Sequence, residues 1–196
     1  MKKNTRKPNA VTNKNAKLRI IGGEWRSRQL PIPEVEGLRP TPDRVRETVF
    51  NWLNFDIAGA HCADVFCGTG ALGLEALSRG AASCIFVDAN RAAAQQLKSN
   101  LNTLNATNAE VHFTSALTYL DQGPKRPLDI VFLDPPFRKG WLEKILPLLE
   151  EKGWLAPQAL IYIERESESS FDFPSHWELI KEKSAGQLTY SLYKRD

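Results

Sequence analysis

Apolar residues from about position 61 onward occur in short runs, and most runs are separated by segments with helical periodicity. The runs predict strands at residues 61–66, 84–88, 111–114, 128–134 and 159–164. The segments between them predict helices at residues 71–80, 90–104, 117–120 and 141–152. Pro147 lies inside the last helix and is expected to kink or split it. Residues 176–183 and 188–194 alternate polar and apolar positions, which predicts a closing antiparallel hairpin.

This order of elements is typical of a doubly wound α/β fold. A helix that connects two strands of one sheet places those strands parallel, so the five apolar runs are expected to form a parallel sheet. Ligands of such sheets bind beyond the carboxyl ends of the strands. Candidate functional residues should therefore be sought where the predicted strands end.

Two further elements precede the sheet. Residues 18–33 contain two short apolar runs around Gly22-Gly23, with Trp25 just after the glycines, and this pattern predicts a hairpin. Residues 37–53 predict a helix that Thr41 can cap and whose first turn suits Pro42. The expected organisation is a basic tail at 1–17, a hairpin extension at 18–40 and an α/β domain at 41–196.

The composition sets limits on location and chemistry. A chain of 196 residues suits one domain with an appendage. No apolar stretch approaches the roughly 20 residues of a membrane helix, and the start lacks the apolar stretch of a secretory signal, so we expect a cytoplasmic protein with no membrane partner. The three cysteines argue against a disulfide framework; Cys67 is expected to be buried, although a nucleophile there is conceivable. The histidines show no metal-ligand spacing, so we expect no metal.

The charge is concentrated at the N-terminus. Residues 1–28 carry nine Lys or Arg and one acid, a local charge of +8, whereas the whole chain carries a formal charge of +3. The rest of the chain is therefore at −5. Clustered basic residues gain affinity for polyanions by releasing counterions from phosphates, so a nucleic acid is the expected partner. A solubilising tail is an equal alternative for residues 1–16.

The predicted hairpin also combines basic and aromatic side chains. Arg19, Arg26 and Arg28 lie near Trp25, which suits phosphates and unstacked bases. The alternative is a hairpin docked on the body with its charges in solvent. In the following helix, Arg44 and Arg46 lie mostly off the apolar face. They are candidates for the rim of an RNA or substrate site, or for plain solvent exposure.

Gly68, Gly70 and Gly73 follow the strand at 61–66 and form a G-x-G-x-x-G match, and Asp88 ends the next strand. This arrangement is the fingerprint of a dinucleotide site in which the acid binds ribose hydroxyls. Asp64 lies four residues before Gly68, and its carboxylate would oppose a pyrophosphate. S-adenosylmethionine has no phosphate and carries a sulfonium and an ammonium group. The pattern therefore favours this methyl donor over NAD.

The strand at 128–134 ends in Asp134-Pro135-Pro136-Phe137. An exocyclic amine of a nucleobase is a poor nucleophile, and rigid acceptors at its N–H bonds would orient its lone pair and take up developing charge. Phe137 can stack on a base that is flipped out or single-stranded. The alternative is a buried turn with Phe137 in the core. An acid, two prolines and an aromatic would serve guanine, adenine or cytosine equally.

These residues resemble a known family. The corner at Asp134–Phe137 resembles the motif of class I S-adenosylmethionine-dependent amino-methyltransferases. Residues 19–33, 37–53, 64–81 and 133–137 are similar to the RsmD type, which methylates guanine N2 of bacterial 16S ribosomal RNA. The resemblance implies a Rossmann-like fold with a mostly parallel seven-stranded sheet, helices on both faces and a C-terminal antiparallel hairpin. It also implies 16S rRNA or the assembling small subunit as partner, and we expect a monomer.

The resemblance assigns roles by position. Asp134, Pro135, Pro136 and Phe137 would be catalytic. The cofactor would be bound by Asp64, Phe66, Gly68, Thr69, Gly70, Asp88, Ala89, Ser115, Ala116 and Asp134. RNA would be bound by Arg19, Trp25, Arg26, Arg28, Arg44, Arg46, Arg138 and Lys139. The family often has Glu at position 88 and the wider class an acid near 115–116, where this chain has Asp88, Ser115 and Ala116. Two rival classes remain: an NAD-dependent oxidoreductase and a non-catalytic RNA-binding module.

Overall fold

The computed structural model describes residues 16–35, 37–38, 40–169 and 172–196. The strands of the main sheet are β3 His61–Asp64, β4 Ser83–Asp88, β5 Ala109–Phe113, β6 Leu128–Leu133, β7 Leu155–Glu166, β8 Trp177–Ala185 and β9 Leu188–Arg195. The helices are α1 Asp43–Trp52, α2 Ala71–Ser78, α3 Arg91–Thr103, α4 Ala116–Leu120 and α5 Leu142–Glu151. The strands and helices predicted from residue 61 onward are all present, with shifted ends.

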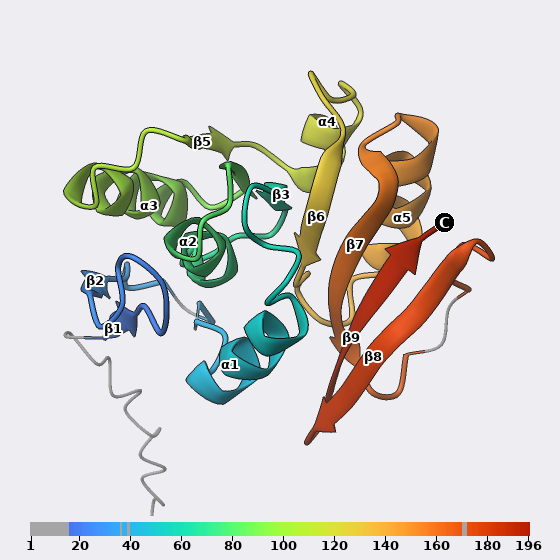
Figure 1. The fold of residues 1–196 in the computed structure, drawn as a ribbon, viewed down its shortest axis with the longest axis horizontal. Coiled ribbons are helices and arrows are strands. Elements are labelled where there is room, and N and C mark those ends of the chain that lie inside the picture. Colours follow the sequence, from blue (N-terminus) through green and yellow to red (C-terminus); the bar gives the residue numbers. More distant parts are fainter. Residues whose placement is uncertain (1–15, 36, 39, 170–171) are drawn as a thin grey trace, which may run out of the picture.

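The sheet has the order β5-β4-β3-β6-β7-β9-β8 (Figure 1). In this order, the neighbouring strands β5, β4, β3, β6 and β7 run parallel to one another. Strand β9 pairs antiparallel with both β7 and β8. The predicted doubly wound, mostly parallel sheet with a closing antiparallel hairpin is confirmed. Strands β3 and β6 are neighbours in its centre, so their carboxyl ends lie side by side.

The sheet separates two apolar clusters because successive residues of its strands point to opposite faces. Phe132 and Tyr162 pack with the buried residues of α1, α2 and α3 on one face. Leu133 and Ile163, one position further along their strands, pack with those of α4 and α5 on the other. Both faces of the central strands are therefore covered, and the strand ends remain as the place for a ligand.

The N-terminal hairpin is present and is docked on the body. Strands β1 Lys17–Arg19 and β2 Gln29–Pro31 pair antiparallel, and residues 20–28 connect them, a longer connection than the expected Gly22-Gly23 turn. Leu18, Ile20 and Leu30 are at most 1% exposed and belong to the apolar cluster of α1, α2 and α3. The alternative of a hairpin docked on the body therefore describes how its apolar residues are placed.

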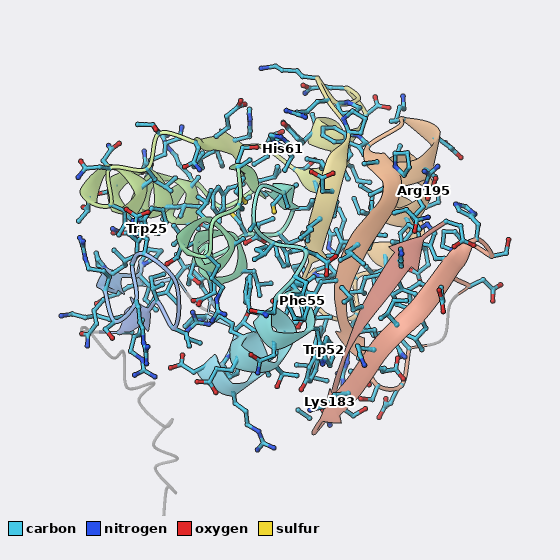
Figure 2. The ribbon with its side chains drawn as sticks, in the orientation of Figure 1. Trp25, Trp52, Phe55, His61, Lys183 and Arg195 are labelled. Carbon is cyan, nitrogen blue, oxygen red and sulfur yellow. The ribbon has the colours of Figure 1, made fainter. Side chains whose placement is uncertain are left out.

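Trp25, which was expected to face RNA, is instead buried in the structure. Trp25 lies where the hairpin meets the helices of the body, and it is 9% exposed (Figure 2). Its amide donates a hydrogen bond of 2.9 Å to Oγ of Ser78 in α2. The ring faces of a buried indole pack against the protein and are not available to a base. Burial of this large apolar surface stabilises the docked hairpin.

Arg46 is also buried, whereas the sequence suggested either the rim of an RNA or substrate site or plain solvent exposure. Arg46 is 1% exposed, and its guanidinium forms ion pairs with Asp43 at 2.6 Å and with Glu75 at 3.3 Å. Glu75, in α2, is completely buried. A buried carboxylate is costly unless a cation and hydrogen-bond donors compensate it, so Arg46 is drawn inward.

Two details of the helices differ from expectation. Thr41 does not cap α1: Pro42 occupies the N-cap position without a side-chain hydrogen bond, and the carbonyl of Thr41 accepts from Nε of Arg46 at 3.1 Å. Pro147 does not split α5, which is one helix from Leu142 to Glu151. Its face of Leu142, Ile145, Leu146 and Leu149 is buried, and this packing offsets the hydrogen bond that proline cannot donate.

Candidate active site

A cavity of about 540 Å³ lies at the carboxyl ends of β3, β4 and β6. Its walls include the loop after β3, the residues after β4, the start of α4 and the corner after β6. We call it the glycine-loop cavity. Of the predicted cofactor residues, those that line it are Asp64, Phe66, Gly68, Thr69, Asp88, Ala89, Ser115, Ala116 and Asp134. The fold thus gathers side chains from four separate segments around one space.

Gly70 does not line the cavity but shapes the loop that does. It is the N-cap of α2 with φ 78°, and a Cβ atom there would lie 2.6 Å from Cδ1 of Leu97. Gly73, one turn into α2, is packed against β4, where an added Cβ would lie 2.2 Å from a ring atom of Phe86. Both positions therefore require glycine, and they fix α2 and its loop against the sheet.

Asp88 is hydrogen-bonded to two segments of the cavity wall. Its carboxylate accepts hydrogen bonds of 2.7 Å from the backbone amides of both Gly68 and Asn90. Each carboxylate oxygen has a second lone pair, so the group can still accept from a ligand hydroxyl. Its position at the end of β4 is the one expected for an acid that binds a ribose.

The same cavity contains buried acids. Asp64 is 2% exposed, and its Oδ2 accepts a hydrogen bond of 3.0 Å from the amide of Gly73. Burial, followed by the negative charges of Asp134 and Asp88, raises the pKa of Asp64 to about 7. Burial also raises the pKa of Asp134 to about 6. A cationic ligand would relieve this repulsion, whereas an anionic one would increase it.

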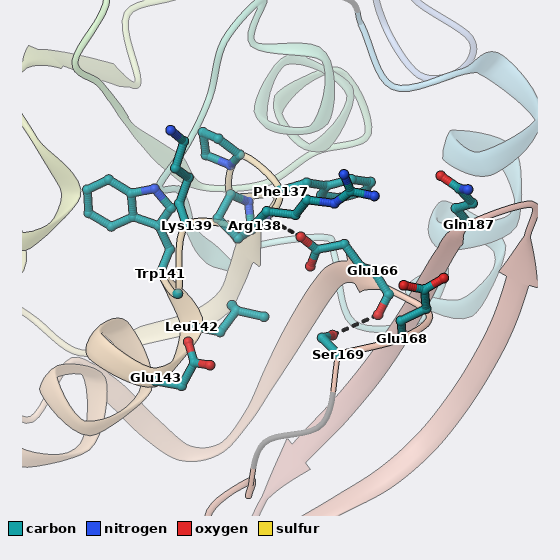
Figure 3. Close-up of a pocket in the computed structure, with 13 residues that line it drawn as sticks. Phe137, Arg138, Lys139, Trp141, Leu142, Glu143, Glu166, Glu168, Ser169 and Gln187 are labelled. Atoms are coloured by element: carbon teal, nitrogen blue, oxygen red, sulfur yellow. Dashed lines mark hydrogen bonds between the residues drawn. The ribbon is translucent and has the colours of Figure 1, made fainter.

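The corner at Asp134–Phe137 borders a second cavity of about 580 Å³ (Figure 3). We call it the Glu166 cavity. Its walls include Arg138, Lys139, Glu166, Glu168 and Ser169, and the amide of Arg138 donates a hydrogen bond to Oε1 of Glu166. Pro135, Pro136, Phe137 and Trp141 line both cavities. Phe137 is 42% exposed, so its ring is available to a ligand rather than buried in the core. The two cavities therefore meet at the corner.

The remaining predicted RNA-binding residues are exposed. Those residues are Arg19, Arg26, Arg28, Arg44, Arg138 and Lys139. Two of them already have protein partners: Arg19 forms an ion pair of 2.8 Å with Asp43, and Arg28 donates to the carbonyl of Thr103 at 3.4 Å. Arg138 and Lys139 lie in the wall of the Glu166 cavity, beside the corner.

Sequence reasoning missed one buried acid beside the site. Glu164 is 4% exposed and accepts a hydrogen bond of 2.9 Å from the hydroxyl of Tyr162. It ends the apolar run predicted at 159–164, as Asp64, Asp88 and Asp134 end theirs. An acid at the end of a buried run is the signal that identifies all four.

Other chemistries find little support in the described part of the chain. No group of three or more His, Cys, Asp or Glu residues there could hold a metal ion. All three cysteines are buried and free, and burial raises the pKa of the Cys67 thiol well above its usual range, so this thiol is a poor nucleophile. None of the described helices has both the length and the apolar character needed to cross a membrane.

Residues 18–194 match the model of a protein family described as "Conserved hypothetical protein 95". The chain belongs to this family. The matched range contains the hairpin, the glycine loop, the corner and almost all of the C-terminal strands. The residues matched by the family model therefore include every part of the candidate site.

Relatives of this Conserved hypothetical protein 95 chain carry more specific names. The present chain is 54% identical over 183 residues to the Ribosomal RNA small subunit methyltransferase D of Escherichia coli strain K12. This match covers 93% of the present chain and 92% of the relative. The chain is also 47% identical over 185 residues to the protein of the same name from Haemophilus influenzae. This match covers 93% of the present chain and 96% of that relative.

Solved structures give the same picture of the fold. The Escherichia coli protein yhhF, 54% identical, superposes with a TM-score of 0.85 over 92% of this chain and 99% of that one. An RNA methyltransferase from Salinibacter ruber, solved in complex with S-adenosyl-L-homocysteine, is 16% identical and superposes with a TM-score of 0.60 over 80% and 94%. The second likeness concerns the fold alone.

Proposed function

We propose that this protein transfers a methyl group from S-adenosylmethionine to the exocyclic N2 amine of a guanine in bacterial 16S ribosomal RNA. The observation that carries the proposal is the meeting of the two cavities at Pro135, Pro136 and Phe137, directly after Asp134, which lines the glycine-loop cavity. One cavity suits a cationic nucleoside and the other is open to a base. The names of the relatives from Escherichia coli and Haemophilus influenzae support a small-subunit rRNA substrate.

The glycine-loop cavity fits the methyl donor. Asp64 and Asp134 favour its positive groups, and Asp88 can accept from its ribose hydroxyls. Ser115 is less suited to the adenine, because its hydroxyl already accepts from the amide of Thr118 at 3.1 Å and contacts that residue's hydroxyl at 2.8 Å. The neighbouring backbone at Ala116, which also lines the cavity, is the better candidate for that contact.

The cofactor supplies a methyl group on a positively charged sulfur. Asp134 accepts a hydrogen bond from the guanine amine and so directs the nitrogen lone pair toward that methyl group. When bound, the cofactor would supply the methyl group that the nitrogen receives, and Asp134 would accept the proton that the nitrogen loses. Pro135 and Pro136 restrict the backbone on which this acceptor is held. Phe137 stacks on the flipped base.

The RNA is held by exposed basic residues around the corner and along the hairpin and α1. Arg138 and Lys139 line the cavity that receives the base, and Arg26, Arg28 and Arg44 contact phosphates further away. The substrate would place the protein in the cytoplasm.

The proposal is tested with labelled methyl donor and small-subunit rRNA that lacks the modification. The purified protein is incubated with deproteinised 16S rRNA and, separately, with assembling small subunits, and the RNA is digested to nucleosides. We expect the label in N2-methylguanosine. Label in N6-methyladenosine or N4-methylcytosine would overturn the assignment of the base, and binding of NADH without binding of S-adenosylmethionine would overturn the reaction.

A further inference from the structure

Glu164 is a buried acid that the methyl transfer described above does not use. It is 4% exposed, and among the described residues no Lys, Arg or His forms an ion pair with it. An ionised carboxylate without a cation is costly in such surroundings, and the usual response of the group is to keep its proton. Glu164 therefore differs from Glu75, the other buried glutamate, which has two arginine partners.

The strand register places Glu164 beside Asp134. In the parallel pair of β6 and β7, Phe132 is opposite Tyr162 and Leu133 is opposite Ile163. Asp134 is the first residue after β6, and continuing this register by one step would bring it next to Glu164 on the face of Phe132 and Tyr162. The charge of Asp134 does act on Glu164, as expected for neighbouring carboxyl groups. Neighbouring strands are roughly 5 Å apart, a separation that two carboxyl groups can bridge with one hydrogen bond.

The groups that face Glu164 come from three strands and from the residue that follows a fourth. Tyr162 on β7 donates its hydroxyl to Oε1 at 2.9 Å, and Tyr190 on β9 is opposite Glu164 in the register. Asp134, directly after β6, and Asp64 on β3 contribute negative charge. Helix α1 covers this face with aromatic rings: Phe50 packs on Phe132 and Trp52 stacks on Tyr190.

These surroundings decide which carboxyl group holds a proton. Burial, followed by the charge of Asp134, raises the pKa of Glu164 to about 8, whereas burial raises that of Asp134 to about 6. Two buried carboxyl groups that repel each other hold a proton more readily than isolated ones, and we assign that proton to Glu164 because no described cation pairs with it. Because Oε1 of Glu164 already accepts from Tyr162, the proton on its other oxygen is free to be donated.

We propose that Glu164 is a positioning residue, which in its protonated form donates a hydrogen bond to the carboxylate of Asp134 and holds it toward the amine of the base. The role rests on the proposed methyl transfer. Glu164 keeps its proton throughout, and the proton released by the methylated amine goes to Asp134. Tyr162 orients Glu164 from the opposite side.

The test compares Glu164→Gln with Glu164→Leu by single-turnover methyl transfer to small-subunit rRNA across pH 6 to pH 9. Gln is neutral and still donates, so we expect it to retain most of the wild-type rate at neutral pH. Leu cannot donate, and loss of a hydrogen bond to a charged group should lower the rate about 10- to 100-fold. Glu178→Gln, on the exposed side of β8, is the matched control and should behave as wild type.

The pH profile separates positioning from a merely structural role. The wild-type rate should fall above about pH 8, where Glu164 ionises, and Glu164→Gln should lack that fall. Titration of the RNA affects both proteins equally, so the difference between their profiles reports Glu164. If the Leu variant does not fold, the Gln profile alone decides.

Two results would overturn the role. One is a Gln variant as slow as the Leu variant at neutral pH, and the other is an alkaline fall that persists in the Gln variant. Either result in an active wild-type enzyme would leave the proposed function intact. A wild-type protein that transfers no methyl group would instead overturn the proposed function, and this role with it.

Discussion

At the scale of single residues, each acid of the glycine-loop cavity has a different environment. Asp88 accepts hydrogen bonds from two backbone amides, and Asp64 accepts a hydrogen bond from one. For Asp134, burial is the main influence on the pKa. These differences suit different tasks: Asp88 is fixed for hydroxyl groups, Asp64 provides charge, and Asp134 can exchange a proton. The glycines of the loop are equally specific, because the space around them differs from one to the next.

Replacing Gly70 with alanine should damage the loop through a steric contact. The new Cβ atom would lie 2.6 Å from Cδ1 of Leu97, in addition to the cost of φ 78°. Gly59→Ala is the matched control, because Gly59 has φ 77° but nothing within 4 Å of the added atom. We expect Gly70→Ala to lower the free energy of unfolding by roughly 1–3 kcal/mol more than Gly59→Ala does.

Urea unfolding of both variants measures this difference. Titration with S-adenosylmethionine should also show weaker binding by Gly70→Ala, whereas the affinity of Gly59→Ala should equal that of wild type. Equal losses of stability in the two variants would mean that the contact with Leu97 does not constrain the loop.

At the scale of elements, α2 connects the glycine loop to the N-terminal hairpin. Its first residues follow Gly70, and its later residues bind the hairpin backbone. Glu75 accepts hydrogen bonds from the amides of Ile21 at 2.9 Å and Gly22 at 2.7 Å, and forms an ion pair with Arg79 at 2.8 Å. The hairpin is thus part of the structure on which the cofactor loop is built. Deleting it would expose apolar core and should weaken cofactor binding as well as RNA binding.

Glu75→Gln should destabilise the protein and loosen the hairpin. The substitution removes the buried charge that compensates Arg46, and breaking a buried pair in this way costs about 3–5 kcal/mol. Glu47→Gln, at an exposed position of α1, is the control and should cost little. Urea unfolding measures the stability, and hydrogen exchange of residues 16–31 measures the docking. Unchanged exchange in Glu75→Gln would show that Glu75 does not hold the hairpin.

The elements that could be predicted from the sequence are those whose pattern is local. Apolar runs such as 128–134 define strands, and acids at the ends of these runs define the cavity, because a parallel sheet brings its strand ends together. Trp25 and Arg46 could not be placed in this way. Their environment depends on Ser78 and Glu75 in α2, which are distant in the sequence. An arginine off the apolar face of a helix has the same pattern whether it meets solvent or a buried carboxylate.

At the scale of the whole molecule, the basic residues and the two cavities suggest how a long polyanion is positioned on a small enzyme. Exposed arginines lie on the hairpin and on α1, which the ion pair between Arg19 and Asp43 connects. The negative net charge of the rest of the chain disfavours binding of RNA elsewhere. We infer that phosphate contacts fix the RNA while the corner selects one base.

Replacing Arg26, Arg28 and Arg44 with glutamine should weaken RNA binding and reduce its dependence on salt. Each lost phosphate contact lowers the slope of log K against log salt by roughly one, so the triple variant should lose up to about three. The affinity for S-adenosylmethionine should not change. Lys181 and Lys183, exposed on β8, supply the control substitutions. An equal loss of slope in the control variant would mean that the arginines act only through net charge.

The central claim is that the corner at Asp134 orients an amine of ribosomal RNA for methyl transfer. Single-turnover transfer from tritium-labelled S-adenosylmethionine to unmodified small-subunit rRNA tests it most directly, with wild type and Asp134→Ala compared at saturating concentrations. We predict transfer by the wild type and a rate lower by about 10²- to 10⁴-fold in the variant, the usual contribution of a positioned acid–base group. Transfer by Asp134→Ala at the wild-type rate would contradict the account.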